Sequence, residues 1–160
     1  MAPEADTPTG GFRVARTASI RAAPAAIFAR INDFHLWPDW SPWEGLDPDL
    51  SRDYSGPRSG EGAAYAWDGK GKAGAGRMEI IQSYAPSQIV IALSFTRPFK
   101  ANNRVDFTLT SLGELTELSW AMTGAQTWFS RLMGKIFNMD KMIGKDFEAG
   151  LAKLKALVEA

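Results

Sequence analysis

The chain's single histidine lies in the segment INDFHLWPDWSPWEG, residues 31–45, where side chains able to do chemistry are most concentrated. Asp33, Asp39 and Ser41 are close to His35 in the sequence. Nucleophilic catalysis would need a serine and an acid that converge on the imidazole, and no nucleophile-elbow motif is present. We therefore predict no catalytic residue in this segment and expect His35 to pack in a loop or at the surface.

The residue pattern also predicts no metal site and no cofactor. One histidine with scattered carboxylates has no usual metal-ligand spacing, and the absence of cysteine excludes thiolate zinc, iron–sulfur clusters and disulfides. The segment GKGKAG, residues 69–74, fits the pattern GxGxxG, but such glycines bind a dinucleotide only where a helix follows. Here an alternating, strand-like segment follows, which predicts a hairpin turn instead.

Composition places the chain among ordinary globular proteins. Its 160 residues are 45% hydrophobic and 22% charged, which is enough for one domain with a real core. The formal net charge of zero argues against a nucleic-acid partner. We expect residues 1–10, which are polar and rich in Pro and Gly, to be a disordered tail ahead of a single domain at 11–160.

The sequence also bears on location. It contains no apolar run long enough for a transmembrane helix, and its first residues lack the features of a signal peptide. We expect a cytoplasmic protein, and association with a membrane would need a different segment ahead of the first strand.

The apolar periodicity predicts an antiparallel sheet. Residues 12–20 alternate as a first strand, residues 22–31 have a helical apolar face opened by Pro24, and the tryptophan segment breaks into short helical turns. Six further strands are predicted at residues 50–55, 63–69, 75–85, 88–95, 102–111 and 116–124. Short turns between consecutive strands indicate antiparallel pairing.

The end of the chain is predicted to be helical. Residues 127–137 have a wide apolar stripe, and residues 138–159 form a long amphipathic helix of about 33 Å. Only this helix is large enough to cover the inner face of a curved sheet. The fold class is therefore α+β: seven antiparallel strands wrapped around a long C-terminal helix, with two short helices after the first strand.

Strand alternation and the helix stripe predict the residues that line the space between sheet and helix. The predicted lining is Trp40, Tyr65, Trp67, Met78, Leu93, Phe95, Phe107, Trp120, Met122, Met139, Ile143, Phe147 and Gly150, with Met142 also facing the sheet. A strongly curved sheet under one helix is hard to fill, so a mostly apolar cavity is expected. Gly150 on the helix stripe has two alternatives: close packing of helix on sheet, or a gap where a ligand fits.

Two structural roles are open for the three tryptophans Trp37, Trp40 and Trp43. Tryptophan supplies much apolar area, so these residues either plug one end of the sheet or form a wall of the cavity mouth. We expect the charged residues near them in the segment to be solvated.

Three stretches carry a resemblance to a known family. They are the entry pattern IRAAPAAIFARINDFHLWPDWSPW, the segment YSGPRSGEGAAYAWDGKGKAGAGRMEI and the closing pattern IGKDFEAGLAKLKALVE. Together they resemble the START-like, or SRPBCC, superfamily and its polyketide cyclase/dehydrase-like branch of small bacterial proteins. The resemblance implies a helix-grip, Bet v 1-like fold with a deep cavity, usually for hydrophobic ligands. Fold alone does not assign chemistry.

We therefore expect binding or transport of a small hydrophobic or lipid-like ligand in the cavity, rather than catalysis. A cyclase/dehydratase-type enzyme that uses the same cavity is one alternative, with Tyr65 the clearest polar group on the inner face. An interaction module with a filled core is another. Contact of residues 127–137 with a membrane surface stays open, and the oligomeric state is not predicted.

Overall fold

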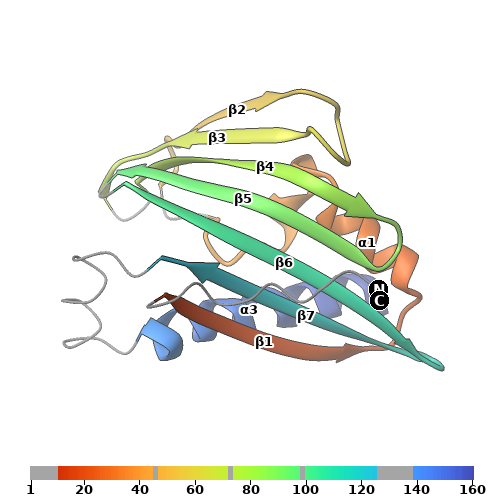
Figure 1. Cartoon of the computed structure of the whole chain (residues 1–160). Coiled ribbons are helices and arrows are strands. Elements are labelled where there is room, and N and C mark those ends of the chain that lie inside the picture. The colour runs from red at the N-terminus through yellow and green to blue at the C-terminus, as the bar shows by residue number, and fades with distance from the viewer. Residues whose placement is uncertain (1–10, 45–46, 72–73, 98–99, 126–138) are drawn as a thin grey trace.

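The computed structural model describes residues 11–44, 47–71, 74–97, 100–125 and 139–160. The predicted tail at 1–10 and the apolar segment at 127–137 lie outside the described residues. Within the described part, one curved sheet forms the body of the molecule, and the helices lie on one of its faces (Figure 1).

The sheet has the seven strands that the sequence predicts. They are β1 (Phe12–Ile20), β2 (Ser51–Ser55), β3 (Ala64–Asp68), β4 (Ala75–Tyr84), β5 (Gln88–Arg97), β6 (Ala101–Leu112) and β7 (Leu115–Gly124). Their order across the sheet is β1-β7-β6-β5-β4-β3-β2, and every neighbouring pair is antiparallel. The glycine-rich segment at 69–74 joins β3 to β4, with the Gly69 N–H donating to the Gly74 carbonyl at 2.8 Å, so the predicted hairpin turn is confirmed.

Two short helices follow β1. Helix α1 (Pro24–Ile31) begins at Pro24, where the missing N–H of proline costs no helical hydrogen bond. The 3₁₀ helix η1 (Phe34–Asp39) follows, and its N-cap residue Asp33 accepts a hydrogen bond from the His35 N–H at 2.9 Å. The apolar face of α1 is buried, as its helical spacing predicts.

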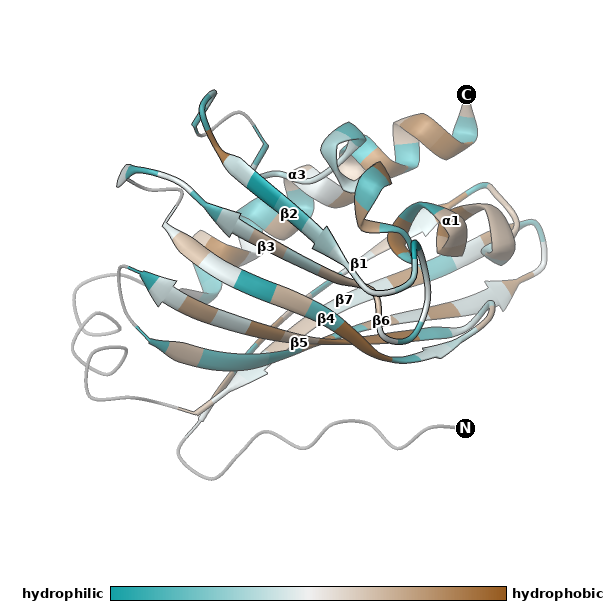
Figure 2. Cartoon of the chain, turned by 90° about the horizontal axis from the view of Figure 1, so that it is seen from above, coloured by the Kyte–Doolittle hydropathy of each residue, from teal (hydrophilic) through white to brown (hydrophobic). Residues whose placement is uncertain are grey.

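The long helix α3 (Met139–Glu159) covers the concave face of the sheet. It runs along β7 and β1, and Figure 2 places it on the same face of the sheet as α1. Phe147, Leu151 and Leu154, at helical spacing, are each at most 2% exposed. A sheet wrapped around one long helix is the α+β helix-grip arrangement, and the sequence prediction of the fold is confirmed.

An arginine on β1 holds the first turns of α3. The Arg16 guanidinium pairs with Asp140 at 3.0 Å and with Glu148 at 3.1 Å. It lies directly over Gly144, which leaves room for the arginine because it has no side chain. Glycine therefore lets the edge strand reach both acidic residues of the helix.

Candidate ligand site on the concave face

The concave face is tightly packed over one part of its length. Six large side chains there are at most 1% exposed: Ile80, Ile91, Phe107, Leu118, Trp120 and Phe147. Trp40 from the loop after η1 is fully buried among them, with its ring centroid 5.6 Å from that of Trp120 and 6.2 Å from that of Phe107. Four of the predicted lining residues, Trp40, Phe107, Trp120 and Phe147, therefore belong to one closed aromatic cluster.

Gly150 lies against this aromatic cluster. A β-carbon at position 150 would be 2.9 Å from Cζ3 of Trp120 and 3.0 Å from Cδ of Pro42. Both are shorter than ordinary van der Waals contacts. Gly150 therefore allows close packing of the helix on the sheet. It does not leave a gap for a ligand at this position.

A second group of predicted lining residues is only half-buried. We call Trp67, Met78, Phe95 and Ile143 the half-buried group. It lies at the end of the molecule where β3, β5 and β7 end and α3 begins, on the left in Figure 1. Tyr65 and Leu93 lie next to Met78 of this group, and Tyr65, Leu93 and Met122 are 9%, 8% and 7% exposed. Burial of the concave face therefore decreases toward this end.

The strand register brings the half-buried group together on one face. Tyr65, Met78 and Leu93 are neighbours across β3, β4 and β5. One step further along, Gly76 separates Trp67 from Phe95, and the two rings meet edge to face with centroids 5.7 Å apart. A β-carbon at position 76 would be 2.5 Å from Cη2 of Trp67, so this glycine makes room for the indole.

The sequence also predicts that two methionines of α3, Met139 and Met142, face the sheet. Met142 is 54% exposed, so the prediction that it faces the sheet is wrong. Each residue turns the helix by about 100°, and Ile143 and Phe147 already occupy the inner stripe, which leaves Met142 on its outer side. The side chain of Met139 lies outside the described residues.

The Tyr65 hydroxyl is the polar group that the sequence singles out on the inner face. It accepts a hydrogen bond from Nη1 of Arg52 at 3.3 Å, and the same guanidinium pairs with Glu44 at 2.5 Å. Burial raises the pKa of Tyr65, although the Arg52 charge opposes the shift. Tyr65 therefore stays protonated at neutral pH, where it is a hydrogen-bond donor and not a base.

The three tryptophans after α1 divide between core and surface. Trp37 and Trp40 are 5% and 0% exposed, and their indole N–H groups donate to the carbonyls of Ile31 and Arg30 at 2.9 and 3.1 Å. These two residues plug the sheet. Trp43 is 38% exposed and meets Trp120 edge to face at 5.7 Å, so it forms an outer wall of the aromatic cluster.

The charged residues of the tryptophan segment are not simply solvated, and that prediction is wrong. Asp33 is 8% exposed, and its carboxylate bonds Nδ1 of His35 at 2.9 Å and Nε of Arg58 at 3.1 Å. Burial alone would raise the pKa of Asp33, but hydrogen bonds from the backbone N–H and side chain of His35, together with the charge and hydrogen bond of Arg58, lower it below its ordinary value.

The sequence signals only part of this polar cluster. An aspartate two residues before a histidine at the start of a helical turn is a recognisable N-cap pattern. Arg58 lies 25 residues after Asp33 and reaches it only because the β2–β3 connection folds back over η1.

The described residues hold neither a metal-ion cluster nor a membrane-spanning helix. Among the described residues, no group of three or more His, Asp or Glu side chains is arranged to hold a metal ion. Within the same residues, no helix combines the length and apolar character needed to cross a membrane.

Comparison with known families agrees with this architecture. The family model described as polyketide cyclase / dehydrase and lipid transport matches residues 11–159. The chain belongs to this family, as the resemblance in its sequence predicted. No curated protein sequence matches it significantly.

Solved structures share the fold at low sequence identity. Protein CV1439 from Chromobacterium violaceum is 15% identical with a TM-score of 0.65, and the match covers 95% of this chain and 99% of that one. The Aha1 dimer from Colwellia psychrerythraea is 13% identical with a TM-score of 0.66, covering 92% and 96%. DynU16, a putative protein in the dynemicin biosynthetic locus, is 16% identical with a TM-score of 0.64, covering 92% of this chain and 47% of that one.

Proposed function

We propose that the protein binds or transports a small hydrophobic or lipid-like molecule between the sheet and α3, against the half-buried group. The observation that carries the proposal is the uneven burial of one continuous apolar face. Phe107 and Trp120 are at most 1% exposed, while Trp67 and Phe95 on the same face are half-buried. The family, whose description includes lipid transport, supports the same function.

The physical reason is the cost of wetting apolar side chains. Removing apolar surface from water is worth about 25 cal/mol per Å². Methionine adapts to irregular shapes, so Met78 suits a surface that must fit varied apolar groups. A ligand that covered the half-buried group would remove its remaining apolar surface from water.

The test measures binding of an uncharged apolar probe. The full chain is titrated with N-phenyl-1-naphthylamine, whose fluorescence rises in an apolar site. Met78→Gln keeps the length of the side chain and makes it polar, and we expect it to weaken binding about five- to tenfold, the equivalent of about 1 kcal/mol of lost apolar contact.

Ile81→Gln on the same strand is the matched control. Ile81 is 41% exposed, and we expect this variant to bind the probe like the wild type. Equal weakening in both variants, or no saturable binding by the wild type, would contradict the interior site and favour a filled core. Native mass spectrometry of gently purified protein then identifies any molecule carried through purification.

A second candidate function is a cyclase/dehydratase-type reaction in the same space. The Tyr65 hydroxyl, buried and held by Arg52, is the observation that favours it, because a protonated phenol can donate a proton to a substrate carbonyl. Tyr65→Phe separates the two functions. A binder keeps its affinity for the probe, whereas an enzyme loses turnover of a poly-ketone substrate while it still binds.

A further inference from the structure

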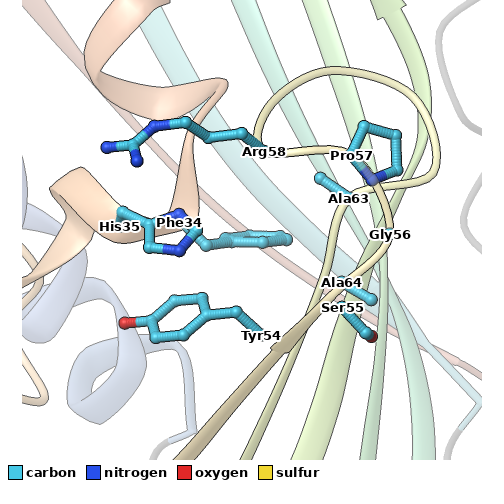
Figure 3. Close-up of a pocket in the computed structure, with 9 residues that line it drawn as sticks. All are labelled: Phe34, His35, Tyr54, Ser55, Gly56, Pro57, Arg58, Ala63 and Ala64. Atoms are coloured by element: carbon cyan, nitrogen blue, oxygen red, sulfur yellow. The ribbon is translucent and has the colours of Figure 1, made fainter.

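A second pocket lies at the β2 edge of the sheet, between η1 and the connection from β2 to β3. It has a volume of about 260 Å³ and is lined by Phe34, His35, Tyr54, Ser55, Gly56, Pro57, Arg58, Ala63 and Ala64. Figure 3 shows the Phe34 and His35 rings between the Arg58 side chain above and the Tyr54 ring below, with Pro57 opposite. Cationic and aromatic side chains therefore meet in one recess.

The Arg58 guanidinium and the His35 imidazole of this pocket are held in place by a buried acid. Asp33 bonds Nδ1 of His35 and Nε of Arg58, as described above. An ionised carboxylate only accepts hydrogen bonds, so Nδ1 carries the proton of the shared bond. Nε2 of His35 and the terminal nitrogens of Arg58 then have no partner among the residues that the structure describes.

The aromatic groups provide a flat wall. The imidazole of His35 stacks on the Tyr54 ring with centroids 4.0 Å apart and an angle of 16° between planes. Tyr54 in turn packs on Tyr65 at 5.1 Å, which anchors the wall to the sheet. Phe34, 3% exposed, supports it from the core.

The charged groups of the pocket indicate which charge its ligand carries. The ionisable groups against His35 in the described residues are Asp33, Tyr54 and Arg58. The Arg58 guanidinium is the one group of these that always carries a positive charge, and the Asp33 carboxylate offsets part of it. A single guanidinium matches a monoanion better than a dianion.

We propose that this pocket binds a small monocarboxylate with a flat apolar body, whose carboxylate is held by the Arg58 guanidinium and whose body packs against the His35 and Tyr54 rings. The planar guanidinium fork fits a carboxylate, and the neighbouring rings fit a flat body. The site is independent of the ligand proposed for the concave face.

The test is an NMR titration of the ¹⁵N-labelled full chain with sodium benzoate. We expect saturable shifts at the amides of Ser55, Gly56 and Ala63, and none with the neutral isostere benzamide at the same concentration. Shifts confined to the half-buried group, or an equal response to benzamide, would overturn the proposal. Tighter binding of inorganic phosphate than of benzoate would overturn the choice of a monocarboxylate.

Two variants of Arg58 keep the test sharp. Its side chain is 70% exposed, so Arg58→Gln removes the charge without opening the core, and we expect benzoate to bind at least about tenfold more weakly. Arg58→Lys keeps the charge and loses the fork, and we expect an intermediate loss. Arg77→Gln, which changes another exposed arginine paired with a carboxylate, should leave binding unchanged. Full affinity in both Arg58 variants would overturn the proposal.

The role of His35 has its own measurement. His35→Ala removes the ring that stacks on Tyr54, and we expect benzoate to bind at least about fivefold more weakly. Full affinity in this variant would overturn the assignment of His35 to the site.

Discussion

The ring of Phe147 on α3 lies flat on the indole of Trp120 on β7, with centroids 4.1 Å apart and an angle of 10° between planes. Both side chains are 1% exposed. This stack belongs to the closed aromatic cluster, and through it α3 packs against β7, the strand next to the β1 edge of the sheet.

Phe147→Ala should therefore destabilise the protein strongly. Truncating a fully buried phenylalanine removes its apolar contacts and leaves a cavity, which costs about 3–5 kcal/mol. Urea unfolding followed by circular dichroism measures the loss. Met142→Ala on the same helix, at a position 54% exposed, should change the free energy of unfolding by less than about 0.5 kcal/mol.

Gly150→Ala should also destabilise, against the usual preference of helices for alanine. The new β-carbon would lie 2.9 Å from the Trp120 ring and 3.0 Å from Pro42, and both neighbours are rigid. Overpacking of this kind outweighs a gain in helix propensity of about 1 kcal/mol, and we expect a net loss of about 1–2 kcal/mol in urea unfolding. Gly144→Ala is the matched control: its β-carbon would meet the end of the flexible Arg16 side chain, so its loss should be smaller. The reverse order would contradict the packing at Gly150.

Asp33→Asn should lower the free energy of unfolding at neutral pH. It should also make this free energy less dependent on pH in the acid range. The folded pKa of Asp33 lies below the unfolded value of about 3.9, so the folded state binds fewer protons. The contribution of this carboxylate is present above the unfolded value and is lost as the pH falls through the folded pKa. We expect a deficit of about 1–2 kcal/mol at pH 7 that shrinks below about pH 4.

Urea unfolding at a series of pH values measures that deficit. Asp53→Asn, at an exposed position on β2, should stay within about 0.5 kcal/mol of wild type at pH 7. A deficit for Asp33→Asn that is the same at pH 3 and pH 7 would mean that the charge of Asp33 adds nothing to stability.

The phenol of Tyr65 should ionise at a higher pH than an ordinary tyrosine. Burial raises its pKa and the Arg52 charge partly opposes this, so the difference between ultraviolet titrations of wild type and Tyr65→Phe should have a midpoint above about 10. Arg52→Gln removes the opposing charge and should move the midpoint still higher. A midpoint that falls in this variant would show that Arg52 does not act on the phenolate.

The sequence by itself determined the element order and the inner face of the sheet. Residues that alternate along strands and repeat every three or four positions in α3 carry that information locally, and the short turns between strands specify antiparallel pairing. For the same reason Phe107, Trp120 and Phe147 could be assigned to the interior from periodicity alone.

Only the tertiary structure decided how completely each inner residue is covered. Trp120 and Trp67 have the same pattern in sequence, yet Trp120 is buried against Phe147 of α3, and Trp67, near the end of β3, is half-buried. Likewise, the sequence around His35 does not predict the contact with Arg58. Both side chains bond Asp33 only because the β2–β3 connection folds back over η1. Burial and charge pairing depend on which distant segments meet, and that is a property of the packed chain rather than of any local pattern.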